Sequence, residues 1–310
     1  MATYNGWDLT NMIDTDYLDQ IRDGLVPKMV TEGITTSIVD VIPGVKNAMT
    51  LNSLDNTITV QADDCTFSPA GNVGLVQKEL RVYPKKVNDA LCPKDLETTY
   101  LAMRMRGNEI PFVEELANSY VNKINAYNET YIWMGNGDDE KGLLQLINED
   151  ADTIDASSEV LSADTYIGKM NALLAAAPTE VLTSDEGVVF CSFAFFQNYM
   201  NELRAQNLYI MANAEYKNNG WTAMIPGTNV RLIATKGIST AYDSELFDIT
   251  GELLVYTLAK NIAVGTDMLG NDENFDIWYS RDAREYRVDM SWKIGANYRW
   301  SDRIVKGYSF

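Results

Sequence analysis

The sequence predicts an α+β fold in which one long helix is combined with extended β segments and a smaller α/β region. Three observations predict it. Apolar residues recur at three- and four-residue steps over residues 112–131, as on one face of a helix. Residues 45–95 and 275–300 alternate in the manner of strands. Between residues 160 and 270, helical and strand patterns follow one another, which is typical of an α/β region.

The clearest helix is expected over residues 111–134. Its apolar stripe consists of Phe112, Leu116, Tyr120, Ile124, Tyr127 and Tyr131. Pro111 stands in the first turn, where a missing N–H costs nothing, and the glycine-rich string at 135–137 should end the helix. We therefore expect a continuous rod about 36 Å long.

The segments before this helix should depend on other surfaces. Residues 1–44 are polar and acidic and cannot form a core alone, so we interpret them as an arm that docks on something larger, such as a neighbouring subunit. In residues 45–95 we expect strands at 45–51, 57–60 and 75–83. A two-stranded excursion of this length would be marginal if isolated, so it should also lie on another surface.

The region after the helix should contain short helices and buried strands. Ser162 is expected to cap a helix over 163–177. Ser192 should cap a second helix directly after a buried strand. The remaining expected elements are that strand at 188–191, the second helix at 193–205, strands at 229–235 and 253–259, a helical turn at 261–268, and strands at 275–279, 285–292 and 296–300.

Composition excludes several classes of function. The chain of 310 residues has 25 Lys+Arg against 44 Asp+Glu, a net charge of −19, and no histidine. Such acidity argues against a protein that binds the phosphates of nucleic acid and against one that binds an anionic membrane surface. The lack of histidine removes Ser-His-Asp and Cys-His catalysts and His-ligated metals. No apolar run approaches a membrane span, and the N-terminus does not resemble a signal peptide. Cys65, Cys92 and Cys191 are interpreted as free thiols.

No motif predicts a catalytic, cofactor or metal site. The string at 135–137 follows a helix, whereas a dinucleotide-binding loop follows a strand. Residues 136–140 alternate like the start of an EF-hand, but Lys141 replaces the required glycine, and the acidic loop at 267–276 has no standard spacing. Ser192 lacks the flanking glycines of a nucleophile elbow. We therefore expect no enzyme and no cofactor.

Charge is distributed unevenly along the chain. Residues 137–186 hold twelve acidic and two basic residues, whereas residues 74–106 hold seven basic and four acidic residues. The basic side chains that crowd together in the second segment are Lys78, Arg81, Lys85 and Lys86. Opposite patches on one kind of chain favour self-association through complementary surfaces. The alternative is a solvated mixture of charges with no partner.

The order of these parts resembles that of the major capsid proteins of tailed double-stranded DNA bacteriophages, whose fold is named for phage Hong Kong 97. Four local strings also look like capsid proteins of phages that infect Bacteroidota: IPGVK at 42–46, KVNDALC at 86–92, IPFVE at 110–114 and IWMGN at 132–136. The resemblance covers nearly the whole chain. It implies an N-terminal arm at 1–44, an E-loop at 45–96, a P-domain at 97–159 with a spine helix at 111–134, an A-domain at 160–270, and returning P-domain strands at 271–310.

The resemblance implies a structural role in a virion. Copies of the chain would self-assemble as hexamers and pentamers into an icosahedral shell that encloses double-stranded DNA without sequence-specific binding. The implied partners are portal and scaffold proteins and decoration or head-completion proteins, with assembly in the host cytoplasm and no membrane. The short arm leaves no room for the scaffolding region of some relatives, and no position here matches the Lys–Asn cross-link of others.

Two alternatives stand beside the capsid hypothesis. An encapsulin-like bacterial nanocompartment would keep the fold and enclose enzyme cargo instead of DNA. An acidic enzyme with a carboxylate-bound metal is the weakest reading.

The four crowded basic residues are the candidate assembly interface. In the family the E-loop lies over the neighbouring subunit on the shell exterior. We therefore expect Lys78, Arg81, Lys85 and Lys86 to contact an acidic surface of the adjacent copy, from residues 137–186 or from the arm. Contact within the same subunit is disfavoured, because a long hairpin points away from its base.

Overall fold

The structure is a computed structural model of the chain. It describes residues 32–61, 70–91, 112–137, 139–208, 213–217, 220–242, 250–267, 275–283 and 285–309. The predictions made for residues 1–31, for Cys65 and Cys92, and for most of the acidic loop at 267–276 lie outside the described residues.

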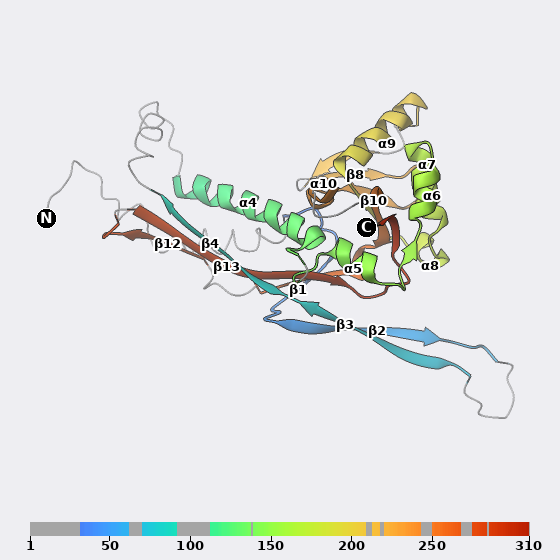
Figure 1. Ribbon diagram of the computed structural model, residues 1–310, viewed down its shortest axis with the longest axis horizontal. Helices are drawn as coiled ribbons and strands as arrows, with labels where there is room; N and C mark the ends of the chain where they lie inside the picture. Colours follow the sequence, from blue (N-terminus) through green and yellow to red (C-terminus); the bar gives the residue numbers. More distant parts are fainter. Residues whose placement is uncertain are drawn as a thin grey trace.

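The first sheet lies beneath the long helix (Figure 1). Its strand order is β1-β11-β13-β12, and β4 also pairs with β13. Its strands are β1 (Asp40–Pro43), β4 (Tyr83–Leu91), β11 (Ile262–Thr266), β12 (Phe275–Ser280) and β13 (Glu285–Tyr298). The long strand β13 organises this sheet, because β12 and β11 pair with its residues 285–290 and 294–298, and β4 pairs with its residues 286–294.

The second sheet has seven strands in the order β5-β14-β10-β6-β9-β8-β7. They are β5 (Ile154–Asp155), β6 (Gly187–Cys191), β7 (Glu215–Lys217), β8 (Gly220–Met224), β9 (Arg231–Ala234), β10 (Thr250–Leu258) and β14 (Val305–Ser309). The helices are α4 (Phe112–Met134), α5 (Leu143–Glu149), α6 (Ser157–Ser162), α7 (Tyr166–Ala175), α8 (Thr179–Leu182), α9 (Phe193–Ala205), α10 (Lys236–Tyr242) and the 3-10 turn η2 (Ala259–Asn261).

Alternate residues of the central strand β6 face two different cores. Val188 and Phe190 belong to the core that includes α4, α5, α10 and the first sheet. Val189 and Cys191 belong to the core beneath α6, α7, α8 and α9. A strand covered on both faces needs apolar side chains on both, which explains the unbroken apolar run that predicted a buried strand. Cys191 is a free thiol, and burial raises its pKa.

The helix predicted at 111–134 is confirmed as α4, but its buried surface is wider than the predicted stripe. Asn125, Asn128 and Glu129 are buried, whereas Tyr127 is 44% exposed. The physical reason is that two different sides of α4 are packed against other parts of the chain. Trp292 of the first sheet donates to Asn128, while residues 33–39 and α10 cover the Glu129 side.

The excursion predicted in residues 45–95 is a two-stranded hairpin followed by a separate strand. β2 (Ala48–Thr57) and β3 (Asn72–Arg81) pair antiparallel and project away from the body (Figure 1). The strand expected at 45–51 overlaps β2, which continues to Thr57, whereas the strand expected at 57–60 is wrong because residues 58–60 lie beyond the pairing with β3. The strand is interrupted at Val82, and β4 then pairs with β13 in the first sheet.

Three other predicted elements are wrong in detail. Ser162 ends α6, and the cap of the next helix is Thr165, whose hydroxyl accepts from the Gly168 N–H at 3.0 Å. The helical turn expected at 261–268 is the buried strand β11, whose β-branched residues suit a sheet. The two strands expected at 285–292 and 296–300 are one continuous strand, β13. By contrast, the helix after Ser192 and its serine cap are confirmed.

The described part of the arm docks on its own subunit. β1 pairs in parallel with β11, and Ile34 and Val39 are buried in the core that contains α4. The prediction that the arm lacks a core of its own and docks elsewhere is therefore confirmed for residues 32–43, although the surface that receives them is not a neighbour's.

Candidate functional site: an assembly surface on the projecting hairpin

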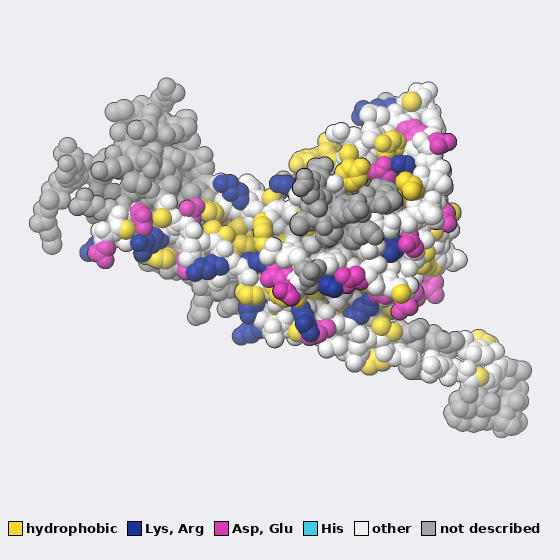
Figure 2. Space-filling model, in the orientation of Figure 1, with side chains coloured by type: hydrophobic (Ala, Val, Ile, Leu, Met, Phe, Trp, Pro, Cys, Tyr) yellow, Lys and Arg dark blue, Asp and Glu magenta, His cyan; other side chains and the backbone are white. Residues whose placement is uncertain are grey.

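The hairpin β2–β3 exposes apolar side chains beyond its buried root, where Leu51 and Leu80 pack on Ala263. Leu54 is 61% exposed and Leu75 is 57% exposed, and beyond β2 the side chains of Ile58 and Val60 are 83% and 91% exposed. Figure 2 shows hydrophobic side chains on the projection outside the body. Leu54 and Leu75 lie directly opposite each other in the hairpin, so this apolar pair is a candidate contact for another molecule.

The root of the hairpin is seated on a pair of glycines. Gly265 of β11 and Gly295 of β13 lie opposite each other in the sheet register. A methyl group on Gly295 would lie 1.8 Å from the carbonyl oxygen of Arg81. On Gly265 it would meet the side chains of Val82 and Leu80 at 2.9 and 3.0 Å. The absence of side chains at both positions lets the hairpin root pack directly on the sheet.

Lys78 ties the hairpin to the body through a carboxylate and a tyrosine. Its Nζ lies 2.6 Å from Asp150 Oδ2 and 3.7 Å from the centre of the Tyr298 ring. The Tyr298 hydroxyl donates to the same carboxylate oxygen at 2.7 Å, and Ser301 donates at 2.8 Å. Burial alone would raise the pKa of Asp150, but the hydrogen bonds that it accepts from Lys78, Tyr298 and Ser301 hold it well below its usual value. The carboxylate is therefore charged throughout the neutral range.

Lys85 repeats this arrangement on β4. Its Nζ pairs with Glu140 and lies 4.2 Å from the centre of the Tyr131 ring, near the end of α4. The Tyr131 hydroxyl donates to Glu140 Oε2 at 3.0 Å. Burial and the neighbouring Glu140 charge raise the pKa of Tyr131, so the phenol keeps its proton for this bond. We call the two Lys–Tyr–carboxylate sets, Lys78–Tyr298–Asp150 and Lys85–Tyr131–Glu140, the twin clamps.

The twin clamps correct part of the interface prediction. The partners of Lys78 and Lys85 do come from the acidic segment 137–186, but from the same subunit. The argument from hairpin geometry is wrong for these two lysines, because they lie near the root and on β4 and not on the projecting part.

Arg81 and Lys86 are placed differently from the clamp lysines. The Arg81 guanidinium is paired with Glu79 at 2.8 Å, and the Arg81 side chain is 63% exposed. Lys86 is also exposed, on β4 opposite Ser291 of β13. For these two residues, a role in contact with another copy stays a prediction.

Sequence reasoning identified the acidic segment as a partner but not its individual residues. Asp150 and Glu140 look like any other acid in the segment, and Tyr131 was assigned to an apolar stripe. A faint signal exists, since Tyr131 and Glu140 flank the glycine-rich string that folds the chain back. There Asn136 N–H donates to the carbonyl of Glu140 at 2.8 Å.

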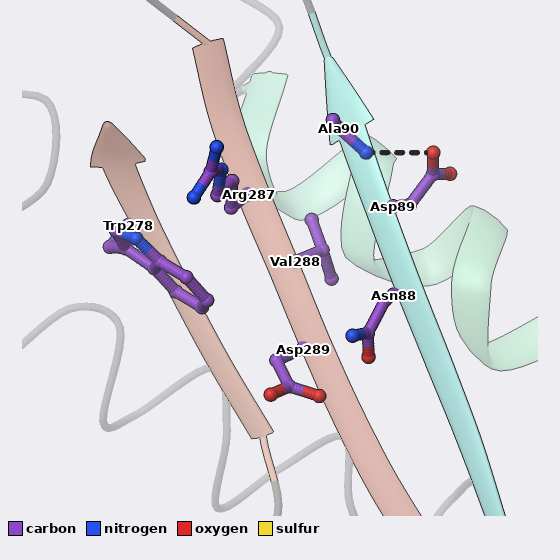
Figure 3. A pocket seen from close by; sticks show the side chains of 7 residues that line it. All are labelled: Asn88, Asp89, Ala90, Trp278, Arg287, Val288 and Asp289. Carbon is purple, nitrogen blue, oxygen red and sulfur yellow. Dashed lines mark hydrogen bonds between the residues drawn. The ribbon is translucent and has the colours of Figure 1, made fainter. Parts of the chain in front are cut away.

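A cavity of about 310 Å³ opens on the first sheet, lined by β4, β12 and β13 (Figure 3). Trp278 is its largest side chain, and Asp89 accepts from the Ala90 N–H at 2.9 Å. Arg287 is ion-paired with Glu285 at 2.9 Å, and Asp89 also accepts from the Tyr120 hydroxyl. Arg287 is thus ion-paired on the sheet, and Asp89 is hydrogen-bonded to β4 and to α4.

Several residues considered as metal ligands or nucleophiles from the sequence make structural contacts in the part of the chain that the structure describes. Glu140 of the EF-hand-like string pairs with Lys85, and Ser192 caps α9 by accepting from the Phe195 N–H at 3.1 Å. Asp267 accepts from the Lys293 N–H at 2.7 Å. Within the described ranges no three His, Cys, Asp or Glu side chains gather as a metal site. In the same ranges, no helix has the length and hydropathy of a membrane-crossing segment.

Solved structures resemble this architecture although sequences do not. No protein-family model and no curated protein sequence matches the chain. The capsid of an empty GTA particle is similar with a TM-score of 0.60 at 9% identity, covering 90% of each chain. A Microbacterium phage Oxtober96 structure has a TM-score of 0.54 at 12% identity, with 88% of this chain and 90% of that chain covered. The satellite phage P4 procapsid has a TM-score of 0.53 at 11% identity, with 92% and 97% covered.

The chain has the Hong Kong 97-type capsid fold. The likeness extends over about nine tenths of both chains and so concerns the whole architecture, not one shared motif. The predicted α+β fold class is thereby confirmed.

Proposed function

We propose that this protein is a major capsid protein of a tailed bacteriophage, a structural subunit that self-assembles as hexamers and pentamers into an icosahedral shell around double-stranded DNA. The observation that carries the proposal is the Hong Kong 97-type fold itself, supported by similarity to phage and GTA capsids over about nine tenths of the chain. The role is structural, not catalytic.

The projecting hairpin supports self-assembly on physical grounds. Leu54, Ile58, Val60 and Leu75 leave more than half of their side chains in water in the single subunit. Burying apolar surface is favourable by roughly 25 cal/mol per Å². A second copy of the chain is the partner that a shell provides, repeated at every subunit.

The proposed parts follow the family's order. β2–β3 is the projecting part of the E-loop (45–96), α4 is the spine helix of the P-domain (97–159), and the seven-stranded sheet lies mainly in the A-domain (160–270). The returning P-domain strands fall in 271–310. We further propose portal, scaffold and decoration or head-completion proteins as partners, and assembly in the host cytoplasm. An association with phages of Bacteroidota rests on the four local sequence strings.

An encapsulin-like nanocompartment is the second candidate. One observation favours it: the fold also resembles a virus-like particle from Pyrococcus furiosus, with a TM-score of 0.51 at 9% identity, covering 95% of this chain and 100% of that chain. Both candidates predict closed shells, so the content of the shell separates them.

The test is to express the full chain, purify the assembled material and examine it by electron microscopy and mass spectrometry. The capsid proposal expects icosahedral particles that hold DNA when they are isolated from phage-producing cells. Particles with a protein load and no DNA would favour the compartment. A chain that stays monomeric at high concentration, with and without a co-expressed scaffold protein, would contradict both.

Reversing two exposed charges near the hairpin should impair assembly without unfolding the subunit. We expect Arg81→Glu combined with Lys86→Glu to lower the yield of shells at low salt and to recover part of it at high salt, where like-charge repulsion is screened. Exposed pairs contribute only about 0–1 kcal/mol each, but the change is repeated in every copy. The yield is measured by sedimentation at several salt concentrations.

A matched control separates a local contact from total charge. Arg204→Glu with Lys217→Glu alters the net charge equally at exposed positions of α9 and β7. Assembly of the Arg81/Lys86 variant at the wild-type level, or equal loss in the control, would contradict the proposed contact. Lys85 is unsuitable for this test, because Lys85→Glu would place two carboxylates together where the side chains are only 11% and 22% exposed, whereas Arg81 and Glu79 are 63% and 50% exposed and their repulsion is screened by solvent.

A further inference from the structure

The arm is fastened to the spine helix by a buried carboxylate. Glu129 of α4 is only 3% exposed. Its Oε1 accepts from the Thr35 N–H at 2.8 Å, and its Oε2 accepts from the Thr35 hydroxyl at 2.7 Å. Trp133, one helical turn further along α4, donates its indole N–H to the same hydroxyl at 3.0 Å. We call residues 33–39 the arm turn.

The fit around this carboxylate is close on every side. A methyl group on Gly33 would lie 2.4 Å from Glu129 Oε1. On Gly237 of α10, it would lie 2.3 Å from the backbone oxygen of Glu129. The arm turn is itself one helical turn, with Ser37 N–H donating to the Gly33 carbonyl at 3.0 Å. Water is therefore excluded as long as the arm turn stays docked.

Among the described residues, no cation is a source of the pKa shift of this carboxylate. The arm turn contains no ionisable side chain, and Glu32 before it is exposed. On α10, Lys236 and Tyr242 are exposed, and on α4 the neighbours one turn away are Asn125 and Trp133, which are neutral. Burial raises the pKa of Glu129 to about 7, and the bonds from Thr35 and Thr36 offset only part of that rise.

We propose that the arm turn is a pH-dependent latch, which is closed on α4 while Glu129 carries a proton and which loosens when this buried carboxylate becomes ionised. When the arm turn undocks, water can hydrate the Glu129 carboxylate. Ionisation of Glu129 therefore favours the open state. The latch would set how firmly residues 33–39 are held on α4. It is a property of the single subunit and does not depend on the proposed function.

The sign of the pH effect follows from linkage. The docked state raises the pKa of Glu129 from 4.5 to about 7, so between these values the docked state binds more protons than the open state. The stability of the docked turn is therefore greatest below pH 4.5, falls as pH rises, and levels off above about 7. From pH 5.5 to 7.5 the opening equilibrium should rise about 20-fold.

Amide hydrogen exchange of the full chain tests this latch. Glu129→Gln keeps the shape and an acceptor for the Thr35 N–H but cannot ionise. Residues 33–39 are identical in both proteins, so the ratio of their exchange rates at one pH cancels the intrinsic pH dependence of exchange. We expect the ratio of wild type to variant to rise about 20-fold from pH 5.5 to 7.5. Glu202→Gln is the control, since Glu202 accepts from the Ile167 N–H in another core.

If the ratio of wild type to Glu129→Gln does not change across this pH range, the latch is overturned. If the ratio of Glu202→Gln to Glu129→Gln rises as much as the wild-type ratio does, the latch is supported. If Glu129→Gln does not fold, wild type alone suffices. The protection of residues 33–39, corrected for intrinsic rates, is then compared with that of the buried strand β6. A parallel change in both segments would show global loosening and would overturn the proposal.

Discussion

Replacing Ile124 by proline should abolish shells of normal size. Ile124 lies in the middle of α4 and is 3% exposed in the main core. Proline removes a backbone hydrogen bond and clashes with the preceding turn, which costs about 3 kcal/mol or more. The kink would also displace the far end of the helix, where Trp133 holds Thr35 and Tyr131 takes part in a clamp. Urea unfolding and electron microscopy of the variant measure the two effects.

The matched control is Ile124→Val, which keeps the helix and removes one methyl group. Its cost should be only about 0.5–1.5 kcal/mol, and shells should form. Normal shells from Ile124→Pro would show that α4 need not be continuous. Failure of both variants would place the effect in core packing and not in the helix.

Adding a methyl group at Gly295 should detach the hairpin root from the sheet. In Gly295→Ala the new carbon would lie 1.8 Å from the Arg81 carbonyl oxygen and 3.0 Å from Val82 Cα. Both obstacles are backbone atoms, which cannot rotate away, so we expect a destabilisation of about 3 kcal/mol, the upper end of ordinary overpacking. Hydrogen exchange should increase in β3 and β4 in particular.

Gly265→Ala is the control on the neighbouring strand. There the new methyl group would meet only side-chain atoms of Val82 and Leu80, which can shift. We expect a cost of about 1 kcal/mol and an unchanged hairpin. Equal costs for the two glycines would contradict the argument that backbone contact at the root decides the outcome.

The sequence predicted those elements whose signals are local. The helix α4 has its periodicity and its C-terminal stop in one stretch, and its end at Gly135 needs a left-handed φ of 71°, which glycine adopts freely. The strand β6 and the helix α9 after Ser192 were predicted for the same reason, since a buried apolar run is followed at once by a capping residue. Such features do not depend on what packs against them.

Other features depend on partners that are distant along the chain. Residues 262–266 were expected to be helical, but they pair with β1 on one side and β13 on the other, and this pairing outweighs the local pattern. The twin clamps join residues 72 and 55 positions apart, so no spacing rule could reveal them. The burial of Glu129 could not be predicted, because nothing in the sequence shows that the arm turn covers that side of α4.

The central position of β13 has a consequence for the timing of protein synthesis. Among the described strands β13 is the partner of both β4 and β12, yet it is not made until residues 285–298 leave the ribosome. Until then the apolar faces of α4 and β4 have no sheet to cover them, and such long-range pairing is slow. A nascent chain can therefore fold this half only when nearly all of it has been translated. Products of translation interrupted before β13 would lack the glycine on which the root of the hairpin packs.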